Sequence, residues 1–188
     1  GYTMVSGNGA AVLGSSDGIE SLGEFVQTDG VKVFFSAGNN KIFSGDTTLT
    51  DISSSLTITA NNWDMASLAN KFYFFQRDHG PLVYDPSTSA LTTIAAHSAV
   101  TGTPPDANIC LAAFGRLWAA DVTGNKQTIY WTDSLNGLIW SGGSSGSIDL
   151  TTVWPNGFDE ITALHSHNNF LIIFGRRSIL VYSGATDP

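Results

Sequence analysis

The chain alternates short apolar runs with polar turns, and the same order of runs returns four times. In each copy, an apolar run, a tight turn, a second apolar run, a polar connection and a run carrying an aromatic residue follow one another. The second runs read VKVFFS, FYFFQ, RLWAA and FLIIFG. Short runs of this kind, bounded by turn residues, are typical of β-strands. No window has the pattern of a helix of ten residues, so we predict an all-β chain.

An aromatic residue in the third run of each copy marks the length of the repeat. The four residues are Phe43, Tyr84, Tyr130 and Tyr182. They lie roughly 40–50 residues apart, which is the length of a four-stranded propeller blade. We therefore predict a β-propeller of four-stranded antiparallel blades, with these aromatic residues at equivalent positions. A sandwich or barrel with regular strand spacing is the alternative.

The repeat divides the chain into a leading segment and four blades. These cover residues 1–22, 23–60, 61–97, 105–153 and 158–188, and the last blade is incomplete because it stops after its third run. Candidate fourth strands are residues 56–59, 91–96 and 138–140. Since four blades are the lower limit for closure, and the first residue is not Met, we expect part of a larger propeller in a longer protein. Alternatively, residues 10–13 supply the missing strand and close a four-bladed ring.

The amino-acid composition limits the kinds of molecule that the chain is expected to bind and the classes of protein to which it could belong. The 188 residues carry a formal net charge of −8, from 16 acidic and 8 basic side chains. Arg176 and Arg177 are the one basic cluster, so ordinary phosphate-clamping recognition of nucleic acid is disfavoured. Cys110 is the single cysteine, which excludes a disulfide-stapled secreted module. The apolar runs are far shorter than the ~20 residues of a transmembrane helix, so we predict no membrane-spanning segment.

Candidate chemistry is sparse. His165 and His167 share one strand face, but zinc needs three or four ligands and nothing nearby completes a known set. Carboxylates are scattered along the chain, at Asp29, Asp46, Asp78, Asp85, Asp106, Asp121 and Asp133. Most of them stand beside Gly, Asn, Ser or Pro, where Asp caps turns. The sequence predicts no catalytic, cofactor-binding or metal site, and we interpret Cys110 as a small core residue.

The tetrapeptide Tyr-Trp-Thr-Asp at residues 130–133 is typical of the propellers of lipoprotein receptors. It occurs once, and the equivalent positions of the other copies read IFSGD, LVYDP and LVYSG. Only the aromatic residue and a nearby small or acidic residue persist. The motif therefore gives no support to a receptor.

Two stretches carry a different resemblance: FGRLWAADVTGNKQTIYWTDSLNGLIW and ITALHSHNNFLIIFGRRSILVYSGATDP. They resemble the propeller domain of podovirus tail nozzles (the tail tubular protein B family) and of related phage head-completion, DNA-stabilising tail proteins. The matching positions are Gly115, Arg116, Leu117, Trp118, Tyr130, Asp133, Trp140, Phe174, Gly175, Ser178, Ile179, Val181, Tyr182 and Gly184. About half of the chain is covered well, and the first two repeats match by pattern alone.

The resemblance implies a structural virion protein of a bacteriophage tail and not an enzyme. Family members form a ring, typically a hexamer, that contacts adaptor or portal proteins and tail fibres and lets genomic DNA leave the capsid. We expect the DNA to pass without tight binding. The alternatives are a carbohydrate-binding or carbohydrate-cleaving propeller, such as a tail adhesin, and a generic protein-interaction propeller. The aromatic side chains that could bind carbohydrate are those of Trp63, Trp118, Trp131, Trp140 and Trp154.

Overall fold

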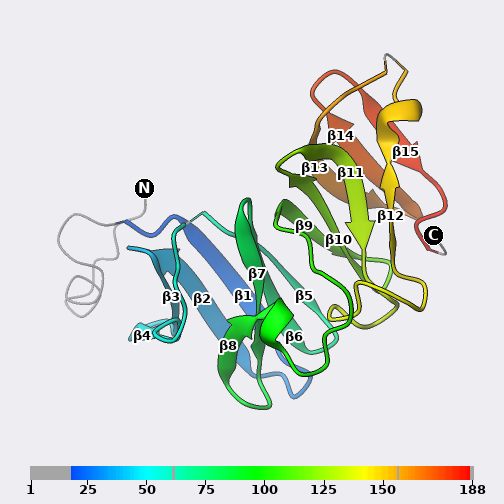
Figure 1. The fold of residues 1–188 in the computed structure, drawn as a ribbon. Helices are drawn as coiled ribbons and strands as arrows, with labels where there is room; N and C mark the ends of the chain where they lie inside the picture. Colours follow the sequence, from blue (N-terminus) through cyan, green and yellow to red (C-terminus); the bar gives the residue numbers. More distant parts are fainter. Residues whose placement is uncertain (1–17, 61, 156, 187–188) are drawn as a thin grey trace.

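A computed structural model describes residues 18–60, 62–155 and 157–186 of the chain. The described residues form short strands and two single-turn 3₁₀ helices, η1 (Ile94–Ala96) and η2 (Leu150–Thr152), as Figure 1 shows. The prediction of an all-β chain is confirmed. In the described part of the chain, no helix is long and apolar enough to cross a lipid bilayer.

The strands form four antiparallel sheets, each built from consecutive strands. The first sheet contains β1 (Ser21–Val26), β2 (Lys32–Gly38), β3 (Lys41–Ser44) and β4 (Thr50–Asp51). The second contains β5 (Asp64–Leu68), β6 (Lys71–Gln76), β7 (His79–Asp85) and β8 (Ala90–Thr93). The third contains β9 (Ala107–Ala113), β10 (Arg116–Val122), β11 (Asn125–Trp131) and β12 (Gly146–Asp149). The fourth contains β13 (Ile161–His167), β14 (Phe170–Gly175) and β15 (Ile179–Tyr182).

The turn between the first two strands of each sheet explains why consecutive runs pair. Gly30, Asn70, Gly115 and Asn168 hold these turns with positive φ angles of 85°, 57°, 70° and 52°. Gly and Asn adopt this region at least cost, and such turns match the twist of the flanking strands. Each apolar run is thereby folded back onto its neighbour.

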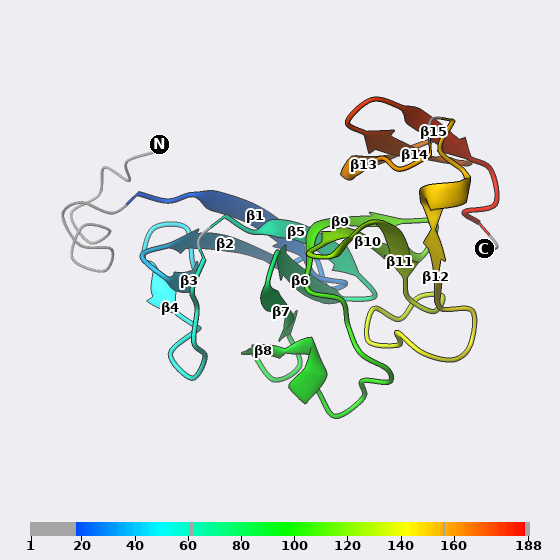
Figure 2. The same cartoon turned by 45° about the horizontal axis from the view of Figure 1, so that its top comes forward.

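The four sheets follow one another in an arc (Figures 1 and 2). Their first strands are neighbours, since β1 contacts β5, β5 contacts β9 and β9 contacts β13. The first and fourth sheets lie at opposite ends of the arc in both views. This arrangement is compatible with successive blades of a propeller.

The core consists of the layers between neighbouring sheets. We call the face that a sheet turns toward the next sheet its leading face, and the opposite face its trailing face. Phe35 on the leading face of the first sheet stacks on Phe72 of the second at 5.0 Å between ring centroids. Tyr73, the next residue of β6, points the other way and packs against the third sheet. Inner sheets are covered on both faces, which explains runs such as FYFFQ that are apolar throughout.

The four marker aromatics occupy equivalent places. Phe43, Tyr84, Tyr130 and Tyr182 lie in β3, β7, β11 and β15, the third strands of their sheets. Their cross-strand partners are Ser36, Phe72, Ala119 and Leu171, and all four aromatics lie on trailing faces. The prediction of equivalent third-strand positions is confirmed.

The predicted fourth strands are only partly right. Residues 91–96 fall in β8 and η1, but residues 56–59 form no strand, because β4 pairs with β3 immediately after the turn at Gly45. Ile58 instead fills the layer between the first two sheets. Residues 138–140 are also not the fourth strand, which is β12; Leu138 is buried in a loop and Ile139 bridges to Thr101.

The fourth sheet has three strands, in keeping with the incomplete last repeat of the sequence. The candidate closing strand at residues 10–13 lies outside the described residues. The first strand begins at Ser21, two residues before the predicted start of the first blade at residue 23.

Candidate functional site

A hydrogen-bonded cluster at the turn end of the third sheet unites three of the family-matching residues. Gly115 forms the turn, and Arg116 follows it at the start of β10 with its side chain buried. The Arg116 Nη1 atom donates to the carbonyl oxygen of Thr132 at 3.0 Å and to the hydroxyl of Ser144 at 2.8 Å. A buried guanidinium needs such acceptors, because an unpaired buried charge is costly.

Asp133 completes this cluster from the other side. Its Oδ1 atom accepts hydrogen bonds from the Ser144 hydroxyl at 2.7 Å, from the Ser144 backbone N–H at 3.0 Å and from Ser134. The bonds from Ser144 and Ser134, together with the charge of Arg116, lower the pKa of Asp133. The ionised carboxylate and Arg116 thus fix the loop between β11 and β12, so the cluster is a structural clamp.

The remaining matching residues of the third sheet are core residues. Leu117 lies on the trailing face and Trp118 on the leading face, and both are buried. Tyr130 packs on the trailing face, and Trp140 is half-buried against Phe75 with 6.1 Å between ring centroids. The structure gives these positions packing roles.

One matching residue of the fourth sheet, Gly175, lies against a second buried carboxylate, Asp159. This carboxylate accepts backbone hydrogen bonds from Glu160, Arg176 and Arg177 at 2.9–3.1 Å. Burial would raise its pKa, but the three N–H donors and the charge of Arg177 outweigh burial and lower the pKa. A Cβ atom at Gly175 would lie 2.5 Å from this carboxylate, so the position requires glycine.

The other matching residues of this sheet are spread over it. Ser178 accepts a hydrogen bond from the Gly175 N–H through its carbonyl at 2.7 Å, and Phe174 is half-buried in β14. Tyr182 lies against Gly184, where a Cβ atom would meet its hydroxyl at 2.9 Å. Val181 points to the open leading face. The two matched stretches therefore build two separate structural clusters, and the structure does not join them into one site.

An ion pair in the second sheet escaped the sequence analysis. The Lys71 Nζ atom lies 2.6 Å from Asp85 Oδ2, and the Asp85 Oδ1 atom accepts from the hydroxyl and N–H of Ser87. Lys71 opens the second strand of its sheet, as Arg116 does, and Asp85 closes the third strand. Two features of the sequence could have predicted this ion pair: a basic residue at the start of the second strand, and an acidic residue directly after the marker aromatic Tyr84.

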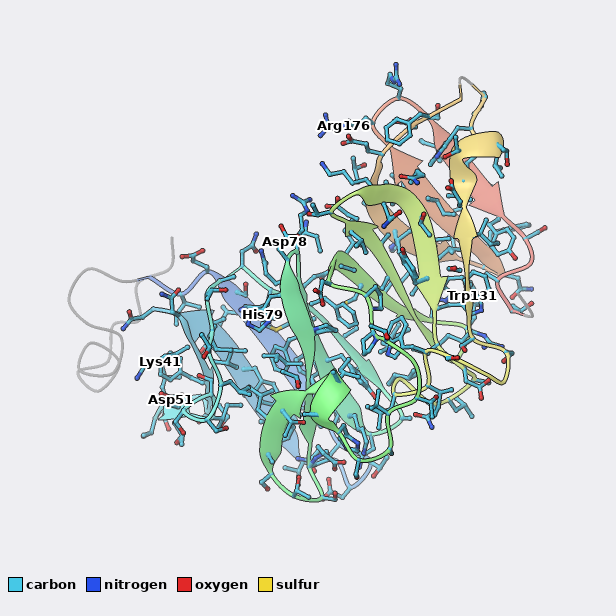
Figure 3. The ribbon with its side chains drawn as sticks, in the orientation of Figure 1. Lys41, Asp51, Asp78, His79, Trp131 and Arg176 are labelled. Carbon is cyan, nitrogen blue, oxygen red and sulfur yellow. The ribbon has the colours of Figure 1, made fainter. Side chains whose placement is uncertain are left out.

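All eight basic side chains are engaged within the chain. Six are in ion pairs: Lys32 with Glu24, Lys41 with Asp51, Lys71 with Asp85, Arg77 with Asp121, and both Lys126 and Arg176 with Glu160. Arg116 and Arg177 donate to carbonyl oxygens. The Arg77–Asp121 and Lys126–Glu160 pairs join neighbouring sheets. Figure 3 shows that three charged residues lie along the same side of the arc: Lys41 of the first sheet, Asp78 of the second and Arg176 of the fourth.

Residues weighed for catalysis or metal binding have other surroundings. In the part of the chain that the structure describes, no group of three His, Cys, Asp or Glu side chains could hold a metal ion. His165 and His167 lie exposed on β13. Cys110 is buried beside Asp64, and burial raises the pKa of its thiol. Asp29, Asp46, Asp85 and Asp133 accept hydrogen bonds from backbone N–H groups of their own turns, as predicted.

The tryptophans offer little surface to a ligand. Trp63, Trp118, Trp131 and Trp154 are buried, and Trp140 is half-buried. Trp118 and Trp131 pack against each other with 5.5 Å between ring centroids, in the layer between the third and fourth sheets. Sugar rings stack on exposed aromatic faces, which these residues do not provide.

The sequence matches no protein-family model and no curated protein. Among solved structures, the fold is similar to the extracellular domain of the hybrid two-component system BT4673 from B. thetaiotaomicron, with a TM-score of 0.57 and 12% identity. That similarity covers 88% of this chain and 24% of the other, so this chain spans about a quarter of that domain. It is also similar to the computationally designed Ika4 protein, with a TM-score of 0.51, 14% identity and coverage of 89% and 91%. At these identities the similarities concern the fold alone.

Proposed function

We propose that this chain is a propeller segment of a bacteriophage tail nozzle, a structural virion protein that forms part of the wall of the channel through which DNA leaves the capsid. The proposal begins from the resemblance of two stretches to the podovirus nozzle family. The matched residues with defined contacts, among them Arg116, Asp133 and Gly175, serve the architecture of the sheets. That is what a structural protein requires of them.

The observation that carries the proposal is the engagement of every lysine and arginine inside the chain. A base that already has a carboxylate partner presents a dipole to an approaching phosphate, and not a free positive charge. Non-specific DNA binding depends on lysine and arginine contacts with phosphates, each of which releases counterions. Arg116 is buried, and Arg177 is an exposed base that donates to the Phe158 carbonyl and forms no ion pair among the described residues. A surface with so few free bases lets a duplex slide past.

The acidic excess acts in the same direction. The net charge of −8 repels DNA, although screening limits this field to about 8 Å at physiological ionic strength. Together, paired bases and surplus carboxylates keep a duplex centred and weakly touched. Such weak contact with DNA is what the wall of a channel requires, whereas a protein that holds DNA in place requires free positive charges.

The alternative of a carbohydrate-binding or carbohydrate-cleaving propeller finds less support. It needs aromatic side chains and carboxylates that converge on one accessible surface. Four of the five tryptophans are instead buried between sheets.

Duplex binding tests the proposal. The purified protein is titrated with double-stranded DNA at about 0.15 M salt, where ordinary non-specific binders have dissociation constants of about 10⁻⁴–10⁻⁶ M. We expect binding weaker than this range. Micromolar or tighter binding would mean that the chain grips DNA, and the conduit would have to be abandoned.

A further inference from the structure

His79 is the first residue of β7 (Figure 3), and its ring lies between two backbone carbonyl groups. The Nδ1 atom lies 2.8 Å from the carbonyl oxygen of Gly80, and the Nε2 atom lies 3.0 Å from that of Thr57. A carbonyl oxygen only accepts hydrogen bonds, so each ring nitrogen must donate one. A neutral imidazole carries one N–H, whereas an imidazolium carries two. Both contacts are therefore satisfied only when His79 is protonated.

We propose that His79 is a pH-sensitive latch, whose imidazolium form ties the loop at Thr57 to the second sheet and whose neutral form releases it. A ring that has lost one proton would turn a nitrogen lone pair toward a carbonyl oxygen, and such a contact is repulsive. The bond to Gly80 lies within β7, whereas the bond to Thr57 spans 22 residues and reaches an exposed position where water can replace it. The neutral ring therefore keeps Gly80 and gives up Thr57.

The latch acts on the loop that joins β4 of the first sheet to β5 of the second. Thr57 lies in this loop, and the next residue, Ile58, is 7% exposed and fills the layer between the two sheets. Release of Thr57 frees the backbone that carries Ile58. Opening of the latch therefore loosens the closure of this layer.

Trp63 fastens the end of the same loop and holds the imidazole ring. Its Nε1 atom donates to the carbonyl oxygen of Ala60 at 2.9 Å. The indole and imidazole rings meet edge to face, with 4.8 Å between their centroids and 76° between their planes. This geometry is favourable because the positive edge of one ring meets the negative face of the other. The segment that the latch controls is therefore the short stretch before Ala60.

The two carbonyl groups, and not a carboxylate, select the charged ring. Among the described residues, none of the ion pairs includes His79. The latch therefore depends on the proton of His79 itself. The charged side chains of the surrounding elements are the pairs Lys41–Asp51, Lys71–Asp85 and Arg77–Asp121, together with Asp64, which is bonded to Cys110, and Asp78.

The latch gives the first two sheets a joint whose closure depends on pH. The charge of histidine changes between about pH 5 and 8. Bonds that only the protonated ring can make stabilise the joint at the acidic end of this range and are lost as the pH rises through it. The inference concerns the joint and not DNA, so it can fail while the proposed function stands.

His79→Gln imitates the neutral ring at every pH, because a side-chain amide offers a donor on one arm and an acceptor on the other. Urea unfolding is followed for the wild type, His79→Gln and the control His167→Gln between about pH 5 and 8. His167 is exposed on β13. We expect the midpoint of His79→Gln to lie below that of the wild type at the acidic limit, and the gap to close toward the upper limit. His167→Gln should show no gap that changes with pH.

Proton NMR of the protein with isotope-labelled histidine observes the latch directly. Ring N–H protons in hydrogen bonds exchange slowly with water and give signals, whereas those of exposed histidines exchange too quickly. We expect two such signals from His79 at about pH 5 and one at about pH 8. Both should be absent from His79→Gln.

Other results overturn the proposal. A gap in the urea midpoint that is constant or widens with pH would show that the proton of His79 does not stabilise the joint. Two N–H signals that persist to about pH 8, or fewer than two at about pH 5, would exclude the latch. If His79→Gln does not fold, the wild-type signals decide alone, assigned by their proximity to Trp63.

Discussion

The backbone N–H of Cys110 in β9 donates a hydrogen bond to the Oδ2 atom of Asp64 in β5 at 2.8 Å. This bond crosses the junction between the second and third sheets, where their first strands meet. Burial raises the pKa of Asp64, and the hydrogen bonds from Cys110 and Met65 offset burial only in part. The junction is therefore held by a carboxylate that folding makes harder to ionise.

Asp64→Asn should gain stability relative to the wild type as the pH rises. A carboxyl whose pKa is raised by folding contributes stability that is full below its unfolded pKa of about 3.9 and is lost as the pH rises through the folded value. Asparagine keeps an acceptor for Cys110 without the charge. Urea unfolding of both proteins between pH 4 and 7 measures the difference, which should grow with pH.

Asp64→Ala is the matched control. It leaves the Cys110 N–H without an acceptor and should cost about 1–3 kcal/mol across the same range. If the difference in the free energy of unfolding between Asp64→Asn and the wild type did not change with pH, folding would not raise the pKa of Asp64, and the account of this junction would be wrong.

The Lys71–Asp85 pair should show the opposite pH dependence. Burial would raise the pKa of Asp85, but the hydrogen bond and charge of Lys71 and the bonds from Ser87 outweigh it and hold the pKa well below its usual range. Stability from such a group is present above about pH 3.9 and lost as the pH falls through the folded pKa. Asp85→Asn should therefore destabilise by about 1–3 kcal/mol at pH 7, and by less below pH 4.

Asp29→Asn is the control for this pair. Asp29 accepts one hydrogen bond from Val31 in an exposed turn, so its replacement should change stability by no more than about 0.5 kcal/mol. If both variants lost the same free energy of unfolding, the ion pair of Asp85 with Lys71 would contribute no more than an ordinary turn hydrogen bond.

Gly137 should tolerate no side chain. A Cβ atom there would lie 2.5 Å from the ring of Tyr73 and 2.7 Å from Leu117, inside the layer between the second and third sheets. Overpacking of this kind costs about 1–3 kcal/mol, so Gly137→Ala should lower the urea midpoint. Gly80→Ala is the control, because open space surrounds that position. An unchanged midpoint for Gly137→Ala would contradict the packing of this loop.

Glu160→Gln should create DNA binding by releasing two bases at once. Glu160 Oε2 lies 2.8 Å from Arg176 Nε and 3.6 Å from Lys126 Nζ. Without the carboxylate, both bases can contact phosphates, and the slope of log affinity against log salt should steepen by up to about 2. Fluorescence anisotropy with a labelled duplex at 0.05–0.2 M salt, ranges at which such contacts matter, measures the change.

Asp78→Asn removes one carboxylate on the same side of the arc and frees no base, since Asp78 forms no ion pair among the described residues. It should bind DNA no better than the wild type. If both variants gained the same affinity for DNA, the change in net charge and not the release of Arg176 and Lys126 would explain the binding.

The repeat could be predicted from the sequence because each copy carries its own local signals. Gly30, Asn70, Gly115 and Asn168 set the turns, and the marker aromatics lie at equivalent positions of the third strands. Fourth strands were harder to predict, because an edge strand needs little apolar pattern. The two-residue β4 is one example, whereas the more apolar residues 56–59 supply Ile58 to the core.

The matching motifs marked Arg116, Asp133 and Gly175, but not the clusters that these residues form, and Asp159 lies outside both matching stretches. The members of these clusters come from positions far apart in the chain, such as Arg116 with Ser144 and Asp159 with Arg177, and only the folded sheets bring them together. The pairing of Arg77 with Asp121 depends likewise on the packing of two sheets. Sequence spacing carries no information about such contacts.

The most direct test of the central claim is the location of this chain in phage particles. Virions that encode it are purified, labelled with antibody to the protein and gold, and viewed by electron microscopy. The account predicts gold at the tail and this protein among the virion proteins detected by mass spectrometry. Purified particles that lack the chain, or that carry the label on the capsid and not on the tail, would contradict it.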